Sequence, residues 1–224
     1  MGVAYKADIP VSGTTMLDRV LGALEAAGLH DITLSGYGGM ETDRPVLAGG
    51  EGPADSALLA CQNGPFPVLL TTCDHALLSP AMIDDFLQGA RAADTDLAVG
   101  LATETVVQSA YPDTKRTYLR FADHAVSGCN LFYLADARAL EALRFWRSAQ
   151  ALRKQPLRLA RTVGFTLGLR YAAGRLSLDQ AFEAVGKRLG LSAAPVLLNH
   201  PEAAIDVDCP ADHALVEAIL ASRE

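Results

Sequence analysis

The sequence predicts an α/β fold with a Rossmann-like, mostly parallel sheet and crossover helices. Its length of 224 residues suits one domain with a sizeable core. Short apolar segments of strand length alternate with helical patterns along the chain. One apolar run, Pro67–Thr71, leads to a carboxylate at Asp74, and Ser79-Pro80 then opens a helical pattern. We therefore expect a single domain over residues 1–224, with a helical, Arg-rich insert over residues 135–190.

Each predicted element follows from its own pattern. Apolar residues at helical spacing, closed by Gly28, predict a helix from about Thr15 to Ala27. A second such pattern predicts a helix from Pro80 to Ala93. The other expected elements are strands over 31–36, 45–47, 97–101, 116–121, 128–134, 196–198 and up to 208, a helix start at 57–60, and a last helix through Leu220.

Composition argues against several classes of protein. With 19 basic and 26 acidic residues the net charge is −7, which disfavours a general nucleic-acid binder. The four cysteines are scattered without CxxC spacing, which is typical of reduced thiols in a cytoplasmic protein. No apolar run approaches the ~20 residues that span a bilayer, and no leader pattern opens the chain. We expect a soluble protein.

Asp74 is the first candidate site residue. It lies just past the carboxyl end of a predicted buried parallel strand, the edge at which open α/β sheets bind ligands. A carboxylate there is well placed to hold Mg²⁺, which usually takes one or two protein carboxylates. The alternative is that Asp74 is simply a polar turn residue after a strand.

Three further segments carry polar groups that could face Asp74. Asp206 and Asp208 lie one residue apart at a predicted strand end, so they point to the same face, although Asp208 could instead cap the following helix. Asn130 lies near the start of another predicted strand and could bind a ligand or satisfy backbone groups. A Gly-rich turn, Gly49–Pro53, enters a helix, where backbone amides can approach an anion or a base.

The insert concentrates positive charge in an acidic protein. No Asp or Glu occurs between Glu141 and Asp179, and several cations are three or four residues apart. These residues are Arg144, Arg147, Arg153, Lys154, Arg158, Arg161, Arg170 and Arg175. The pattern indicates either a solvated helical face or a surface for a phosphorylated acceptor or an anionic membrane.

Three motifs, in order along the chain, resemble those of a known family. The segment Lys6–Leu17 resembles the K-x-x-x-P-[VL]-x-G-x-P-[ML]-L motif of MobA-like NTP transferases, the molybdenum-cofactor nucleotidyltransferase-like group. Leu70–Pro80 resembles their metal-binding strand end, and Ile205–Asp212 their closing [DN]-[IV]-[DN]-T-P-E-D segment. The resemblance implies a GT-A-like nucleotidyltransferase fold.

The resemblance also implies site roles. In that family the Lys binds nucleotide phosphates, the strand-end Asp binds magnesium, and the closing segment adds a second metal or phosphate contact. By position these roles fall to Lys6 and Asp74 as catalytic residues, Asp74, Asp206 and Asp208 as metal ligands, and Lys6, Gly52, Pro53, Ala54, Asp55 and Ser56 for the nucleotide. We expect the acceptor to bind at Asn130, Arg147, Lys154 and Arg158.

The implied function is Mg²⁺-dependent transfer of NMP from an NTP to a phosphorylated small molecule, with release of pyrophosphate. The alternatives are a non-catalytic nucleotide- or metabolite-binding homologue and a glycosyltransferase that uses a sugar nucleotide. Two features depart from the family pattern. His75-Ala76 replaces the Pro after the metal-binding Asp, and only five residues precede Lys6, where a strand and a Gly-rich loop are expected. Either the start lies downstream of the natural one or the loop is missing.

Overall fold

The computed structural model describes residues 4–152 and 164–223. Its strands are β1 (Pro10–Val11), β2 (Thr14–Thr15), β3 (Leu34–Ser35), β4 (Val46–Leu47), β5 (Val68–Thr71), β6 (Leu97–Thr103), β7 (Leu119–Arg120), β8 (Ala125–Leu134) and β9 (Ala193–Leu197). Its α-helices are α1 (Met16–Ala26), α2 (Pro53–Cys61), α3 (Pro80–Ala93), α4 (Glu104–Ala110), α5 (Leu140–Leu152), α7 (Phe165–Ala172), α8 (Leu178–Leu189) and α9 (Pro210–Ala221). Three 3₁₀ helices are η1 (Lys6–Asp8), η2 (Ala137–Ala139) and η3 (Pro201–Ala204).

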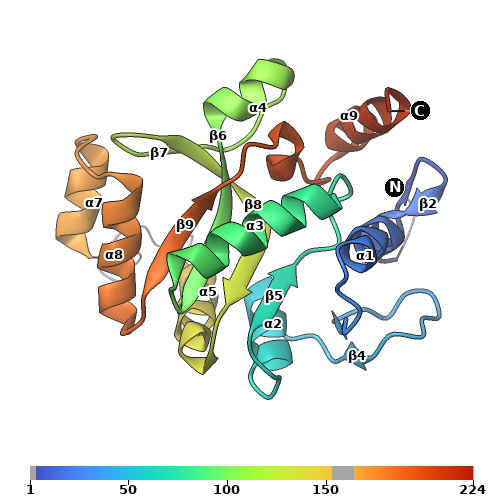
Figure 1. Ribbon diagram of the computed structural model, residues 1–224, viewed down its shortest axis with the longest axis horizontal. Coiled ribbons are helices and arrows are strands. Elements are labelled where there is room, and N and C mark those ends of the chain that lie inside the picture. Colours follow the sequence, from blue (N-terminus) through green and yellow to red (C-terminus); the bar gives the residue numbers. More distant parts are fainter. Residues whose placement is uncertain (1–3, 153–163, 224) are drawn as a thin grey trace.

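The main sheet is mixed and has the order β5-β8-β6-β9, with β7 also paired to β8 (Figure 1). Strand β8 is antiparallel to β5, β6 and β7, whereas β6 and β9 are parallel. The predicted α/β fold is confirmed. Four strands do run in one direction, as a mostly parallel sheet requires, but β8 inserts against that direction between β5 and β6. Most neighbouring pairs are therefore antiparallel.

Helices cover both faces of this sheet, and α3 crosses one face in Figure 1. Alternating side chains of β8 divide between the faces, as strand geometry requires. Leu131 packs in a cluster with Phe86 of α3, and Leu134 packs in another with Leu143 of α5. Burial on both faces explains why β8 carries a nearly continuous apolar sequence.

The two helices predicted in the first half of the chain are confirmed. In α1 the Thr15 side chain accepts a hydrogen bond from the backbone N–H of Asp18. In α3 Ser79 caps the N-terminus, Pro80 takes the first helical position, and Asp94 ends the helix in the left-handed conformation. The α3 N-cap follows directly after the turn that carries Asp74.

Three strand predictions need correction. Strand β5, before Asp74, is half-buried and antiparallel to its partner, because β8 takes the place predicted for a parallel neighbour. Of the predicted strand 116–121 only β7 forms, since the side chain of Arg116 turns toward the C-terminal segment. Residues 205–208 form no strand, and their backbone binds instead to the turn at Asp74, where the N–H of Val207 donates to the Asp74 carbonyl at 3.0 Å.

A small parallel sheet, β3 with β4, lies beside the N-terminal helix. Gly36 and Gly49 follow the two strands, and their backbones touch: a Cβ built on Gly49 would lie 2.8 Å from the Cα of Gly36. Only glycine fits this contact. The close approach leads the chain directly into the N-terminus of α2.

The described part of the insert consists mainly of helices, η2, α5, α7 and α8, and residues 173–177 between α7 and α8 are not helical. All four cysteines are free thiols, as predicted. Across residues 4–152 and 164–223, each helix is too short or too polar to traverse a lipid bilayer.

Candidate functional site

The structure brings Asp74, Asp206 and Asp208 together, as the sequence predicted. Each offers one carboxylate oxygen, and these atoms lie within 4.8 Å of one another. The turn after β5 carries Asp74, and the segment between η3 and α9 carries the other two. The hydrogen bond from Val207 to the Asp74 carbonyl joins the two segments, which are far apart in sequence. We call these three residues the carboxylate cluster.

Lys6 reaches into the carboxylate cluster from η1. Its Nζ lies 2.7 Å from Oδ2 of Asp74 and 2.5 Å from Oδ1 of Asp208. Partial burial lowers the pKa of Lys6, but the hydrogen bonds and charges of the two carboxylates outweigh it, so the net shift is upward. The ammonium group therefore remains charged at neutral pH, and its side chain is 38% exposed.

Asp206 has a different cationic partner. Nη1 of Arg116 donates to Oδ1 of Asp206 at 2.6 Å, and Nδ2 of Asn130 lies 3.4 Å from Oδ2. Burial and the charge of Asp208 raise the pKa of Asp206, and Arg116 opposes that shift. Sequence reasoning missed Arg116, because it assigned the residue to a half-exposed strand. Only its contact partners, 90 and more residues away, reveal its place in the site.

The backbone of Asn130 is unusual for a strand residue. Its φ is +52°, in the left-handed region that Asn tolerates better than most residues. The register between β6 and β8 shifts at this point, which marks a bulge. The bulge aims the Asn130 amide at Asp206 and so brings a mid-sheet side chain to the carboxylate cluster.

Asp212, rather than Asp208, organises the start of α9. Its Oδ2 accepts hydrogen bonds from the backbone N–H groups of Asp208 at 3.1 Å and Cys209 at 2.9 Å. Cys209 is the N-cap residue. The alternative that Asp208 caps this helix is therefore wrong, and its carboxylate faces Lys6 instead.

His75-Ala76 follows Asp74 where the family has a Pro after the metal-binding Asp, and His75 is 1% exposed. Burial lowers the pKa of His75 to about 4, although the charge of Asp74 and the backbone of Glu202 favour the protonated form. The ring is therefore neutral at pH 7. Thr72 donates its hydroxyl to the Asp74 carboxylate and the N–H of Leu78 donates to the His75 carbonyl, so the turn closes without Pro.

The predicted nucleotide-binding residues lie at the start of α2. Gly52 is the N-cap and Pro53 takes the first helical position. The Ser56 hydroxyl accepts a hydrogen bond from the N–H of Gly50 at 2.9 Å, which folds the Gly-rich turn back onto the helix. Ala54 is fully buried, so its side chain cannot reach a ligand, and only its backbone is available for that role.

The predicted acceptor residues do not form one group. Nη1 of Arg147, on α5, lies 2.8 Å from Oδ1 of Asp55, whereas Asn130 contacts Asp206. The hydrogen bond from Arg147 lowers the pKa of Asp55. Lys154 and Arg158 lie outside the described residues. The partner of Arg147 comes from another part of the chain, so the acid-free run in the sequence gave no sign of it.

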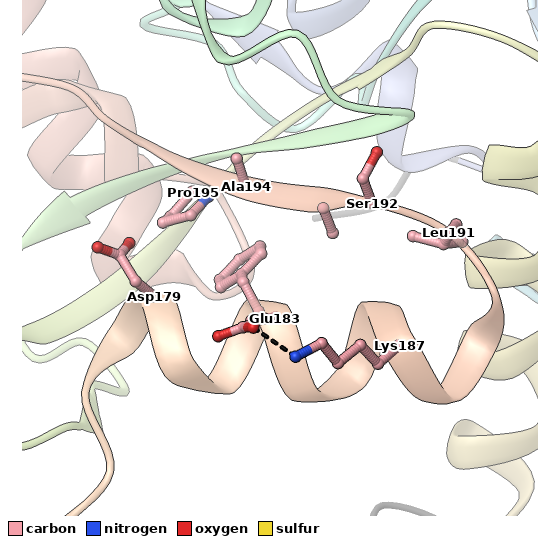
Figure 2. A pocket seen from close by; sticks show the side chains of 9 residues that line it. Asp179, Glu183, Lys187, Leu191, Ser192, Ala194 and Pro195 are labelled. Atoms are coloured by element: carbon pink, nitrogen blue, oxygen red, sulfur yellow. Dashed lines mark hydrogen bonds and ion pairs between the residues drawn. The ribbon is translucent and has the colours of Figure 1, made fainter.

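A separate groove lies between α8 and β9 (Figure 2). It has a volume of about 390 Å³, and its lining combines Phe182, Leu191 and Pro195 with the ion pair of Glu183 and Lys187. Those two charged groups bind each other at 2.5 Å. The groove lacks the converging carboxylates of the cluster, so the cluster is the candidate active site.

Comparison with models of known protein families identifies the family of this chain. The family model of the MobA-like NTP transferase domain matches residues 1–162. The chain belongs to this family. It is therefore a nucleotidyltransferase by class. No curated protein matches the sequence significantly.

Solved structures share the fold. A hypothetical transferase from Thermus thermophilus is 32% identical, with a TM-score of 0.83 over 95% of this chain and 91% of that one. The 2-C-methyl-D-erythritol 4-phosphate cytidylyltransferase from the same organism is 17% identical, with a TM-score of 0.54 over 96% and 94%. Molybdopterin-guanine dinucleotide biosynthesis protein A from Archaeoglobus fulgidus is 12% identical, with a TM-score of 0.52 over 97% and 91%. At these lower identities the likeness concerns the fold alone.

Proposed function

We propose that this protein is a Mg²⁺-dependent nucleotidyltransferase that moves NMP from an NTP to a phosphorylated small molecule. An acceptor phosphate oxygen attacks the α-phosphorus, the bond from that phosphorus to the bridging oxygen breaks, and pyrophosphate leaves with the electron pair. The observation that carries the proposal is the placement of Asp74, Asp206 and Asp208 within 4.8 Å, with Lys6 bound between two of them.

The chemistry of the carboxylate cluster fits magnesium. All three ligand atoms are carboxylate oxygens, the hard donors that Mg²⁺ prefers. With Asp212 the site holds four carboxylates, and Lys6 and Arg116 are their cationic partners, which leaves two negative charges for a divalent cation. When bound, Mg²⁺ would neutralise phosphate charge and increase the electrophilicity of the α-phosphorus.

The protein's own groups would position the substrates rather than form covalent intermediates. Lys6 is partly exposed and carries a single flexible ammonium group, so it can turn from the carboxylates to a phosphate. The Gly-rich turn ahead of α2 presents backbone amides that could contact the nucleotide. Asn130 lies beside Asp206 and would bind the acceptor next to a metal ion held there.

One substrate screen tests the proposal. The protein would be incubated with each of four NTPs, a panel of sugar and alcohol phosphates, and Mg²⁺, and pyrophosphate would be measured. We expect release that needs both substrates and stops with a chelator. The neighbour named as a cytidylyltransferase makes CTP with a polyol phosphate the first combination to try.

A variant and its matched control test whether the reaction takes place at the carboxylate cluster. Asp74→Asn should lower pyrophosphate release at least tenfold, because it removes a charged ligand. Asp84→Asn on the exposed side of α3 is the matched control and should behave as wild type. Pyrophosphate release that persists both in the presence of the chelator and in Asp74→Asn would refute the proposal. Binding of NTP without release would favour the non-catalytic alternative, and transfer of sugar from a sugar nucleotide would favour a glycosyltransferase.

Two broader expectations belong to the same proposal. Four free thiols fit a reducing compartment, so we propose a cytoplasmic location. We also propose a weak contact of the Arg-rich insert with anionic membranes. Vesicle binding at low and high salt would test it, because such contacts are screened over a Debye length of about 10 Å at 0.1 M.

A further inference from the structure

Arg116 is a buried cation in a segment without regular structure. It lies between α4 and β7, and its side chain is only 8% exposed. Its guanidinium makes three described hydrogen bonds, and all of them go to one C-terminal segment. Nη1 donates to Oδ1 of Asp206 at 2.6 Å, and Nη2 donates to the Asp206 carbonyl at 3.2 Å and to Oδ1 of Asp212 at 2.9 Å. The planar, five-donor group suits this forked contact.

These contacts reach both ends of the segment that contains Asp208. Arg116 holds Asp206 directly. It also holds Asp212, whose other oxygen accepts the backbone N–H of Asp208. The position of Asp208 relative to Asp74 therefore depends on a guanidinium that does not bind Asp208 itself.

The two cations of the site differ in exposure. Lys6 is 38% exposed and contacts Asp74 and Asp208, whereas Arg116 is 8% exposed and contacts Asp206 and Asp212. A solvent-accessible ammonium can leave its partners when another cation arrives. A buried guanidinium that left its partners would leave two carboxylates without a cation.

From this arrangement we infer that Arg116 is a positioning residue of the nucleotidyltransfer site: it fixes Asp206 and Asp208 against Asp74 so that a divalent cation finds its ligands already in place. This inference rests on the proposed function, because it assumes that the carboxylate cluster binds the metal. Arg116 acts only through these carboxylates. Loss of the Arg116 guanidinium should therefore first weaken the affinity of the site for a divalent cation.

The test measures Mn²⁺ binding to the protein alone, by the electron paramagnetic resonance signal of free Mn²⁺. Arg116→Gln should weaken binding about 10–100-fold, the range for groups that orient metal ligands. Arg116→Lys keeps the charge but not the fork, so it should recover part of the loss. Arg120→Gln is the matched control: Arg120 lies nearby in sequence, is 66% exposed and pairs with Glu104. It should bind Mn²⁺ as wild type does.

A purely structural role would lower the unfolding temperature without changing Mn²⁺ affinity. Folded Arg116→Gln protein that binds Mn²⁺ as tightly as the Arg120→Gln control would therefore overturn the inference. If Arg116→Gln does not fold, Arg116→Lys and Asp212→Asn carry the test, and both should weaken Mn²⁺ binding. Wild-type protein that binds Mn²⁺ but releases no pyrophosphate would refute the proposed function alone. Wild-type protein that binds no Mn²⁺ would refute the magnesium site on which both depend.

Discussion

Replacing Gly49 with Ala tests the contact between the two turns that precede α2. The new Cβ would lie 2.8 Å from the Cα of Gly36, whereas ordinary contact begins at 3.4 Å, so the backbones must separate by about 0.6 Å. Gly36 has a φ of +72° and its N–H donates to the carbonyl of Leu47 at 2.9 Å, so the turn is already tied to β4. Overpacking of this kind costs about 1–3 kcal/mol.

Urea unfolding provides the measurement, with Gly128→Ala as control, because a Cβ at Gly128 meets no atom within 4 Å. We expect the Gly49 variant to lose about 1–3 kcal/mol and the control to stay within about 0.5 kcal/mol of wild type. If the turn also holds the nucleotide, NTP affinity should fall in the first variant only. Equal stability of the two variants would show that the contact relaxes without cost and would refute the reasoning.

Three further predictions concern other parts of the molecule. Lys6→Ala should weaken triphosphate binding more than monophosphate binding in calorimetry, and equal losses would argue against a phosphate role. Hydrogen bonds from the backbone and hydroxyl of Ser12 lower the pKa of Glu217 from 4.5. The stabilisation from these hydrogen bonds is thus present above pH 4.5 and is lost as the pH falls through the folded-state pKa of Glu217. The difference in free energy of unfolding between wild type and Glu217→Gln should therefore shrink as the pH falls below 4.5, and a difference that stays constant with pH would contradict the prediction. A thiol reagent at pH 7 should modify exposed Cys209 before Cys129, since burial raises the pKa of the Cys129 thiol, and equal rates would contradict that burial.

Local patterns predicted α1, α3 and α9, because their signals lie within the segments themselves, whereas the short helix α4 was not predicted. The α3 boundaries follow from Ser79, Pro80 and the apolar spacing behind them. The pairing of β8 could not be predicted in this way. Its apolar sequence is equally compatible with a parallel or an antiparallel strand when both faces are buried, and its direction relative to β5 and β6 depends on partners more than 20 residues away. Among the described strands, only the short β7 is an antiparallel partner close in sequence.

The same distinction between local and distant signals applies to the residues of the candidate site. Asp74, Asp206 and Asp208 could be grouped from the sequence because each stands in a recognisable motif, and their mutual distances agree with that grouping. Arg116 lacked such a motif, since a buried cation is recognisable only from its carboxylate partners. The pairing of Arg147 with Asp55 was unpredictable for the same reason.

The position of β8 and of the closing segment has a consequence for synthesis on the ribosome. Strands β5 and β6 do not touch each other and each needs β8, so the centre of the sheet cannot form before about residue 134 has emerged. The ion pair of Lys6 with Asp208 spans 202 residues and forms later still. A nascent chain that stalls between these points could fold its sheet yet remain inactive. Catalytic activity would therefore begin only after the C-terminal segment is complete and this long loop has closed to bring Asp208 to Lys6.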